Sequence, residues 1–190
     1  MHRAVSFLVI FFWISFSIDN GAAQQCNCQL SCDQRRCPDS TWKKFTRTNG
    51  HVVCFKPVEK SMDFLTALTY CVQLVGNGTL MGIENQEELD YVKQLGKKWY
   101  HIGAYRNQDC NANQTELLKR PECTTDKMFQ FFDGVTKGTF LWNNHWIEEN
   151  PNSYYRNGEY ESTVAIYDGL VGDWSNADVL QGALCGVTIC

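Results

Sequence analysis

Residues 61–105, SMDFLTALTYCVQLVGNGTLMGIENQEELDYVKQLGKKWYHIGAY, hold two helical patterns, each followed by a strand pattern. In the first, apolar residues recur at helical spacing: Phe64, Leu65, Leu68, Cys71, Val72 and Val75. Ser61 is the expected N-cap of this helix, and Gly76 is expected to end it. The second helix is predicted to begin after Asn85, because Glu88 three residues later completes a capping-box pattern.

Strand patterns lie on both sides of this pair of helices. An alternating stretch from Thr41 to Pro57 is divided by Thr48-Asn49-Gly50, and an Asn-Gly step between β-rich runs is a strong hairpin signal. Further strands are predicted at 80–83, 101–105, 162–167 and 184–189. This order favours an α+β domain whose two chain ends meet in one sheet.

The chain from 107 to 157 has a different character. It is rich in Asn, Asp, Gly, Pro and aromatic residues, and it shows little regular periodicity. Long structured loops of this kind are often where a compact domain carries its function. We therefore look for ligand-binding residues in and beside this region.

The N-terminus has the pattern of a secretory signal peptide. His2 and Arg3 precede an apolar run from Ala4 to Ile18, and Gly21-Ala22-Ala23 supplies the small residues of a cleavage site. The run is shorter than the roughly 20 residues that span a bilayer, which argues against a membrane anchor. The expected organisation is a signal peptide over 1–23, a short cysteine-rich arm over 24–36 and one domain over 37–190, secreted without membrane insertion.

Cysteine usage agrees with export. All ten cysteines follow residue 23: Cys26, Cys28, Cys32, Cys37, Cys54, Cys71, Cys110, Cys123, Cys185 and Cys190. An even number in an exported chain indicates a disulfide framework. Zinc is the alternative for the closely spaced Cys28, Cys32 and Cys37, but no tight Cys-x2-Cys pair is present. The sequons at Asn77 and Asn113 are candidate glycosylation sites.

A series of short motifs follows in order along the chain. They are Cys37-Pro38-x-x-x-Trp42, Tyr70-Cys71, Leu80-Met81-Gly82-Ile83, His101-Ile102-Gly103, Phe132-Asp133-Gly134, Trp146, Asn150-Pro151-Asn152, Glu161-Ser162-Thr163-Val164, Gly172-Asp173-Trp174-Ser175-Asn176 and Leu184-Cys185. Each motif alone is weak, but their order and spacing resemble those of a long-form C-type lectin domain. The resemblance covers about Cys37 to Val187.

The resemblance implies three disulfides: Cys37–Cys54, Cys71–Cys185 and, as an extra staple in the loop region, Cys110–Cys123. Cys26, Cys28, Cys32 and Cys190 remain, and four cysteines allow three pairings. A second inner disulfide of the family is missing, since its positions correspond to Thr163 and the neighbourhood of Val179 and Leu180. The resemblance therefore implies a loop that is held less rigidly than in most relatives.

In sugar-binding members of the family, this loop holds a calcium ion whose shell the sugar hydroxyls complete. The corresponding positions here are Asn150, Asn152, Glu161, Ser175 and Asn176. Amides replace two carboxylates of the family pattern, which leaves Glu161 as the anion unless Glu149, Glu159 or Asp178 joins it. Calcium affinity follows ligand charge, so a metal set of Asn150, Asn152, Glu161 and Asn176 predicts a weak site. In the alternative interpretation, Pro151 makes a turn and the neutral side chains satisfy backbone groups.

Aromatic residues surround the same loop. The resemblance implies that Trp146 and Trp174 are core residues, whereas Tyr154 and Tyr155 are candidate ligand contacts. Two functions follow. One is carbohydrate recognition with weak calcium dependence, of the kind the family uses in innate immunity. The other is calcium-independent binding of an extracellular protein.

Two other function classes are disfavoured. The net charge of −4 argues against nucleic acid, whose phosphates require clustered Lys and Arg. Glu148-Glu149, or Glu159 with Glu161, could form a glycosidase dyad, but adjacent acids on a loop are typical of a solvated surface. The histidines stand in no nucleophile or metal motif. We therefore expect a binding module rather than an enzyme.

Overall fold

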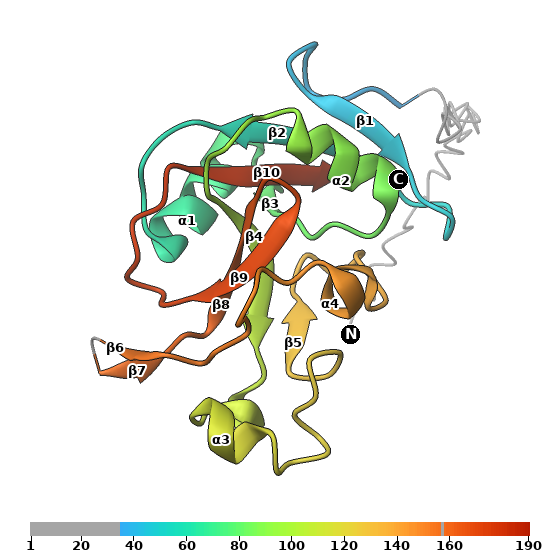
Figure 1. Ribbon diagram of the computed structural model, residues 1–190. Helices are drawn as coiled ribbons and strands as arrows, with labels where there is room; N and C mark the ends of the chain where they lie inside the picture. The colour runs from blue at the N-terminus through green and yellow to red at the C-terminus, as the bar shows by residue number, and fades with distance from the viewer. Residues whose placement is uncertain (1–34, 157) are drawn as a thin grey trace, which may run out of the picture.

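The computed structural model describes residues 35–156 and 158–190, so the expected signal peptide and most of the arm lie outside the described residues. One eight-stranded sheet has the order β1-β2-β10-β4-β8-β9, with β3 paired to β10 and β5 paired to β4 (Figure 1). Its strands are β1 (Lys43–Thr46), β2 (Val52–Val58), β3 (Thr79–Leu80), β4 (Tyr100–Arg106), β5 (Phe129–Phe131), β8 (Thr163–Tyr167), β9 (Leu170–Trp174) and β10 (Gly182–Thr188). The fold is α+β, as predicted.

Four α-helices and a small hairpin accompany this sheet. The helices are α1 (Phe64–Val75), α2 (Gln86–Lys93), α3 (Gln114–Leu117) and α4 (Phe140–Asn144). The hairpin of β6 (Tyr155–Arg156) and β7 (Glu159–Tyr160) forms a separate two-stranded sheet that projects from the body (Figure 1). Among the described residues, no helix is long and apolar enough to cross a membrane.

The two ends of the domain meet in the sheet. The predicted hairpin of β1 and β2 forms, and β10 lies antiparallel to β2 and parallel to β4. Disulfides Cys37–Cys54, Cys71–Cys185 and Cys110–Cys123 are all present, which confirms the three implied pairings. Cys190 is also disulfide-bonded, whereas Cys26, Cys28 and Cys32 lie outside the described residues.

The start of α1 differs from the prediction. Asp63, not Ser61, is the N-cap, and its Oδ1 accepts a hydrogen bond of 2.8 Å from the Thr66 N–H. The chain before it is extended because Met62 exchanges backbone hydrogen bonds of 3.2 and 3.1 Å with Leu180. The helix ends at Gly76, as predicted; its φ of 58° suits a residue without a side chain.

The predicted capping box at α2 is half correct. Asn85 caps the helix by accepting from the Glu88 N–H at 3.1 Å. The Glu88 carboxylate does not return to the N-cap residue, but accepts from the Glu84 N–H at 2.8 Å. It is turned inward because the buried Arg47 guanidinium binds both of its oxygens, at 2.7 and 3.0 Å.

Strand β9 was not predicted as a strand, because Gly172 and Asp173 interrupt its apolar pattern. It pairs with β8 over five residues, with Thr163 opposite Trp174. The main core includes Trp142, but Trp146 only packs against it half-buried, and Trp174 is also half-buried. The implied core role fits Trp146, which packs on Phe129 and Trp142, but not Trp174, which is not among the buried core residues. The half-buried Trp174 instead borders the candidate site.

Both predicted glycosylation sites are accessible. Asn77 is exposed just after α1, and Asn113 is half-buried at the start of α3. The Asn113 Oδ1 caps α3 by accepting from the Glu116 N–H at 3.0 Å, which leaves the amide nitrogen, the glycan attachment atom, outside that bond. Both sites stay predictions.

Candidate functional site

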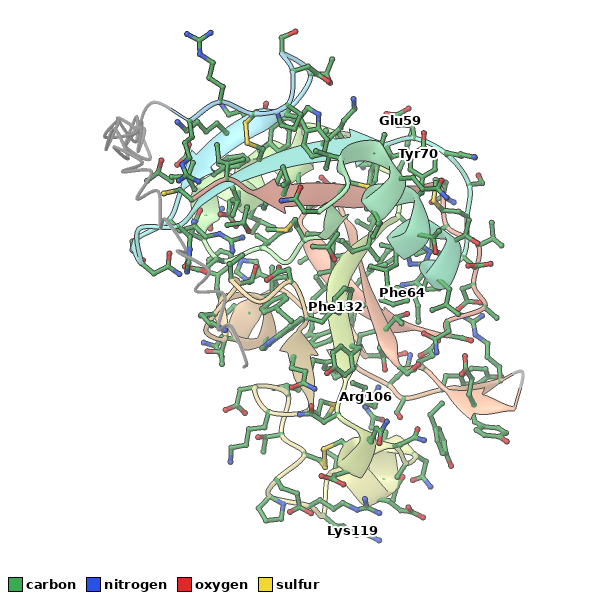
Figure 2. The ribbon with its side chains drawn as sticks, turned by 180° about the vertical axis from the view of Figure 1, so that it is seen from behind. Glu59, Phe64, Tyr70, Arg106, Lys119 and Phe132 are labelled. Atoms are coloured by element: carbon green, nitrogen blue, oxygen red, sulfur yellow. A yellow bond between two sulfur atoms is a disulfide. The ribbon has the colours of Figure 1, made fainter. Side chains whose placement is uncertain are left out.

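A buried ion pair positions the predicted ligand loop. Arg106, the last residue of β4 (Figure 2), binds Asp173 of β9 at 2.6 Å, and both side chains are almost fully buried. Asp173 also accepts from the backbone N–H groups of Asn152 at 3.0 Å and Ser153 at 2.8 Å. A buried pair is favourable only when further hydrogen bonds satisfy its atoms, and here they come from the loop itself.

The same arginine reaches the other side of the loop. Its Nε donates to the Glu161 carbonyl at 2.7 Å, and its guanidinium lies over the Phe129 ring. Between Asn152 and Glu161 the chain makes the β6–β7 hairpin. Arg106 and Asp173 therefore hold both ends of this hairpin against the sheet, directly after a cis peptide bond between Asn150 and Pro151.

The loop borders a pocket of about 390 Å³. It is lined by Trp99, Ile147, Glu148, Asn150, Asn152, Tyr154, Arg156, Glu161, Asp173 and Trp174. Asn150, Asn152, Tyr154 and Glu161 from the predicted ligand set are thus brought together. Tyr155 is exposed outside the lining and packs against Tyr160 at 4.9 Å between ring centroids.

Two indole rings form one wall of this pocket. Trp99 meets Trp174 edge to face, with 4.9 Å between centroids. Gly172 lies between them and the loop: a Cβ there would be 3.2 Å from Asn150 Oδ1 and 3.3 Å from the Trp99 ring. A larger residue would therefore crowd the pocket floor. Sequence analysis missed Trp99, because an aromatic residue just before a strand looks like any core residue.

Arg156 is the second residue that sequence analysis missed. Its Nη2 lies 3.4 Å from Glu161 Oε1 and makes a close hydrogen-bonded ion pair with Asp178. Its guanidinium also lies over the Trp174 ring, 5.6 Å from the centroid. Nothing in its sequence context distinguishes this arginine from a solvated surface residue.

The remaining predicted ligands belong to a neighbouring network. Ser175 is fully buried and donates to Glu159 Oε1 at 2.6 Å, which also accepts from the Asn176 N–H at 3.0 Å. The Ser175 N–H donates to Asp178 at 2.9 Å. The carboxylates of Glu159 and Asp178 therefore lie beside the predicted ligands, but they accept hydrogen bonds from Ser175 and Asn176.

These contacts can be compared with the needs of calcium, which takes six to eight oxygen ligands. Asn152 Oδ1 and Glu161 Oε2 both accept from the Tyr154 N–H, at 3.0 and 3.3 Å. Ser175 and Asn176 are bound to Glu159, and a guanidinium faces the other oxygen of Glu161. In the described part of the chain, no three His, Cys, Asp or Glu side chains are grouped to hold a metal. The residues therefore do not fit a calcium ion in this arrangement.

Glu161 has an unusual titration. Burial raises its pKa to about 7, and the negative charge of Asp173 adds to this effect. The Tyr154 N–H and the Arg156 charge act in the opposite direction without cancelling it. A large fraction of Glu161 is therefore protonated at neutral pH, which weakens it further as a metal ligand.

Several solved structures have a similar fold. The cow CD23 C-type carbohydrate-recognition domain, solved in the presence of a GlcNAc2Man3 oligosaccharide, is 20% identical with a TM-score of 0.56, over 82% of this chain and 98% of that one. The human scavenger receptor C-type lectin carbohydrate-recognition domain is 20% identical with a TM-score of 0.56, over 80% and 99%. A calcium-independent type II antifreeze protein is 17% identical with a TM-score of 0.55, over 80% and 95%. The fold is that of a C-type lectin domain.

A family model narrows this assignment. The model of C-type lectin domain-containing protein 141/158 matches residues 35–186, and the chain belongs to this family. No curated protein matches the chain at a significant level.

Proposed function

We propose that this protein is a secreted lectin-like binding module, not an enzyme, that recognises carbohydrate in the pocket between Trp99, Trp174 and Tyr154 without a resident calcium ion. The observation that carries the proposal is the composition of this pocket. Aromatic side chains and several polar side chains of one loop border the same 390 Å³ space.

Such a pocket suits the two surfaces of a sugar ring. The C–H face of a sugar packs on an indole or phenol ring, and its hydroxyl groups need hydrogen-bonding partners at the rim. Trp99, Trp174 and Tyr154 supply the rings, while Glu148 and Asn150 supply a carboxylate and an amide in the lining of the same pocket. We propose that the sugar binds without a metal ion because the side-chain oxygens of Asn152 and Glu161 already have partners within the loop.

Protein recognition is the second candidate, and a separate observation favours it. Tyr154 and Tyr155 are 62% and 56% exposed, and they stand at the start of the hairpin of β6 and β7, which projects from the body (Figure 1). Exposed tyrosines are frequent anchors of protein interfaces. This surface lies partly outside the pocket, so the two functions make different predictions for single substitutions.

The test is a glycan array probed with the secreted 24–190 protein, followed by titration calorimetry of the best glycan in calcium and in chelator. Asn150→Ala is expected to weaken glycan binding about tenfold, since it removes a polar contact of the pocket. Tyr155→Ala is the matched control and should leave it unchanged. Loss of binding in chelator would contradict the calcium-independent mode. Sensitivity of a protein partner to Tyr155→Ala, with no glycan bound, would replace the proposal by the second candidate.

A further inference from the structure

We infer that Arg156, beside the buried Arg106, is a resident cation of the ligand-binding loop and orders its hairpin where sugar-binding relatives use a metal ion. The inference concerns the order of the loop in the free protein. It is independent of the ligand proposed above, because it is tested without any ligand.

Arg156 joins three segments of the chain. It comes from β6, and its guanidinium contacts Glu161 after β7, Asp178 after β9 and the ring of Trp174 at the end of β9. Glu161 and Asp178 have side chains that are only 8% and 14% exposed. One half-buried cation thus links the hairpin to both strands that support it.

The charges around the loop require this cation. Four carboxylates gather here, and two of them have other partners. Asp173 is neutralised by Arg106, and Glu159 binds the neutral donors of Ser175 and Asn176. Glu161 and Asp178 face Arg156. Without it, Asp178 and the ionised fraction of Glu161 would share a low-dielectric site with no cation, which is unfavourable.

The same link compensates for a covalent bond that this chain lacks. The missing inner disulfide of the family corresponds to Thr163 and the neighbourhood of Val179. Glu161 lies two residues before Thr163, and Asp178 immediately precedes Val179. The bridge from Glu161 through Arg156 to Asp178 therefore joins the two segments that the disulfide would have joined.

The experiment is amide hydrogen exchange by NMR on the disulfide-intact 24–190 protein, which reports local opening. The informative amides are Tyr154 and Ser175, whose N–H groups donate to Glu161 and Asp178, with Leu89 in α2 as an internal reference. In the wild type, about 10 mM calcium is expected to leave all three rates unchanged, although it exceeds the range of weak extracellular sites.

Arg156→Gln is expected to speed exchange at Tyr154 and Ser175 roughly tenfold while Leu89 is unaffected, because charge-assisted bonds are lost only in the loop. Arg156→Lys should restore part of the protection. Arg120→Gln is the matched control, since it breaks the exposed pair with Glu116 on α3. Protection of the wild-type loop by calcium, or unchanged loop exchange in Arg156→Gln, would overturn the inference.

Discussion

The region around α1 and β10 and the ligand loop are held together by different chemistry. Around α1 and β10, the chain is joined by apolar packing and by the Cys71–Cys185 disulfide. In the ligand loop from Asn150 to Glu161, the main links to the rest of the domain are Arg106 with Asp173 and Arg156 with Glu161 and Asp178. Apolar packing tolerates changes of pH and salt, whereas ion pairs depend on the charge of each partner. We therefore expect that the loop can become less ordered while the body stays folded.

Removing the disulfide of the body should have the largest effect. Cys71→Ala with Cys185→Ala opens a loop of 114 residues, and the expected loss is about 4–5 kcal/mol in the free energy of unfolding. Urea denaturation under non-reducing conditions measures it. The matched control is Cys110→Ala with Cys123→Ala, whose separation is 13 residues and whose expected loss is about 3 kcal/mol. Equal losses would show that the stabilisation by these disulfides is not set by the entropy of closing loops of different length.

The buried pair of the loop should come next. Asp173→Asn leaves the Arg106 guanidinium buried without its counter-charge, so about 3–4 kcal/mol should be lost. Lys98→Met breaks the exposed pair with Glu59 and should cost less than about 1 kcal/mol. Chemical denaturation of both variants gives the comparison. A cost for Asp173→Asn as small as that for Lys98→Met would mean that water replaces the lost carboxylate.

The difference between the two regions also explains what could be predicted from the sequence. Leu89 and Val92 of α2, or the strands around Asn49-Gly50, follow spacings that apolar burial imposes on helices and hairpins. Buried ion pairs impose no spacing. Arg106, Arg156 and Asp173 look like solvated residues in the sequence, and their roles depend on partners up to 67 residues away.

The same limit applies within the candidate site. Asn150, Asn152 and Glu161 are predicted from family motifs, and Tyr154 because it stands beside them; all four line the pocket. The motifs do not say which oxygens remain free for a ligand. That depends on the Tyr154 N–H, Glu159 and Arg156, which the motifs do not include.

The titration of Glu161 should make the stability contributed by the loop depend on pH, with a smaller effect than the two changes above. Its pKa is about 7 in the folded protein against an ordinary value of 4.5, so the folded state binds this proton more tightly. The contribution to stability is complete below about pH 4.5 and is lost as the pH rises through 7, with a slope of at most about 1.4 kcal/mol per pH unit. Glu161→Gln removes this titration, so the fall in melting temperature between pH 5 and pH 8 should be smaller in the variant than in the wild type. An equal shift at pH 5 and pH 8 would contradict this assignment.

The smallest expected effect lies in the body, at the start of α1. Asp63→Ala removes the side chain that accepts from the Thr66 N–H at 2.8 Å, and the loss of an N-cap costs about 1 kcal/mol. Ser61→Ala should change stability by less than about 0.5 kcal/mol, since an exposed residue before the cap contributes little. Thermal melts of the two variants decide between these caps. A larger cost for Ser61→Ala would mean that α1 begins two residues earlier in solution.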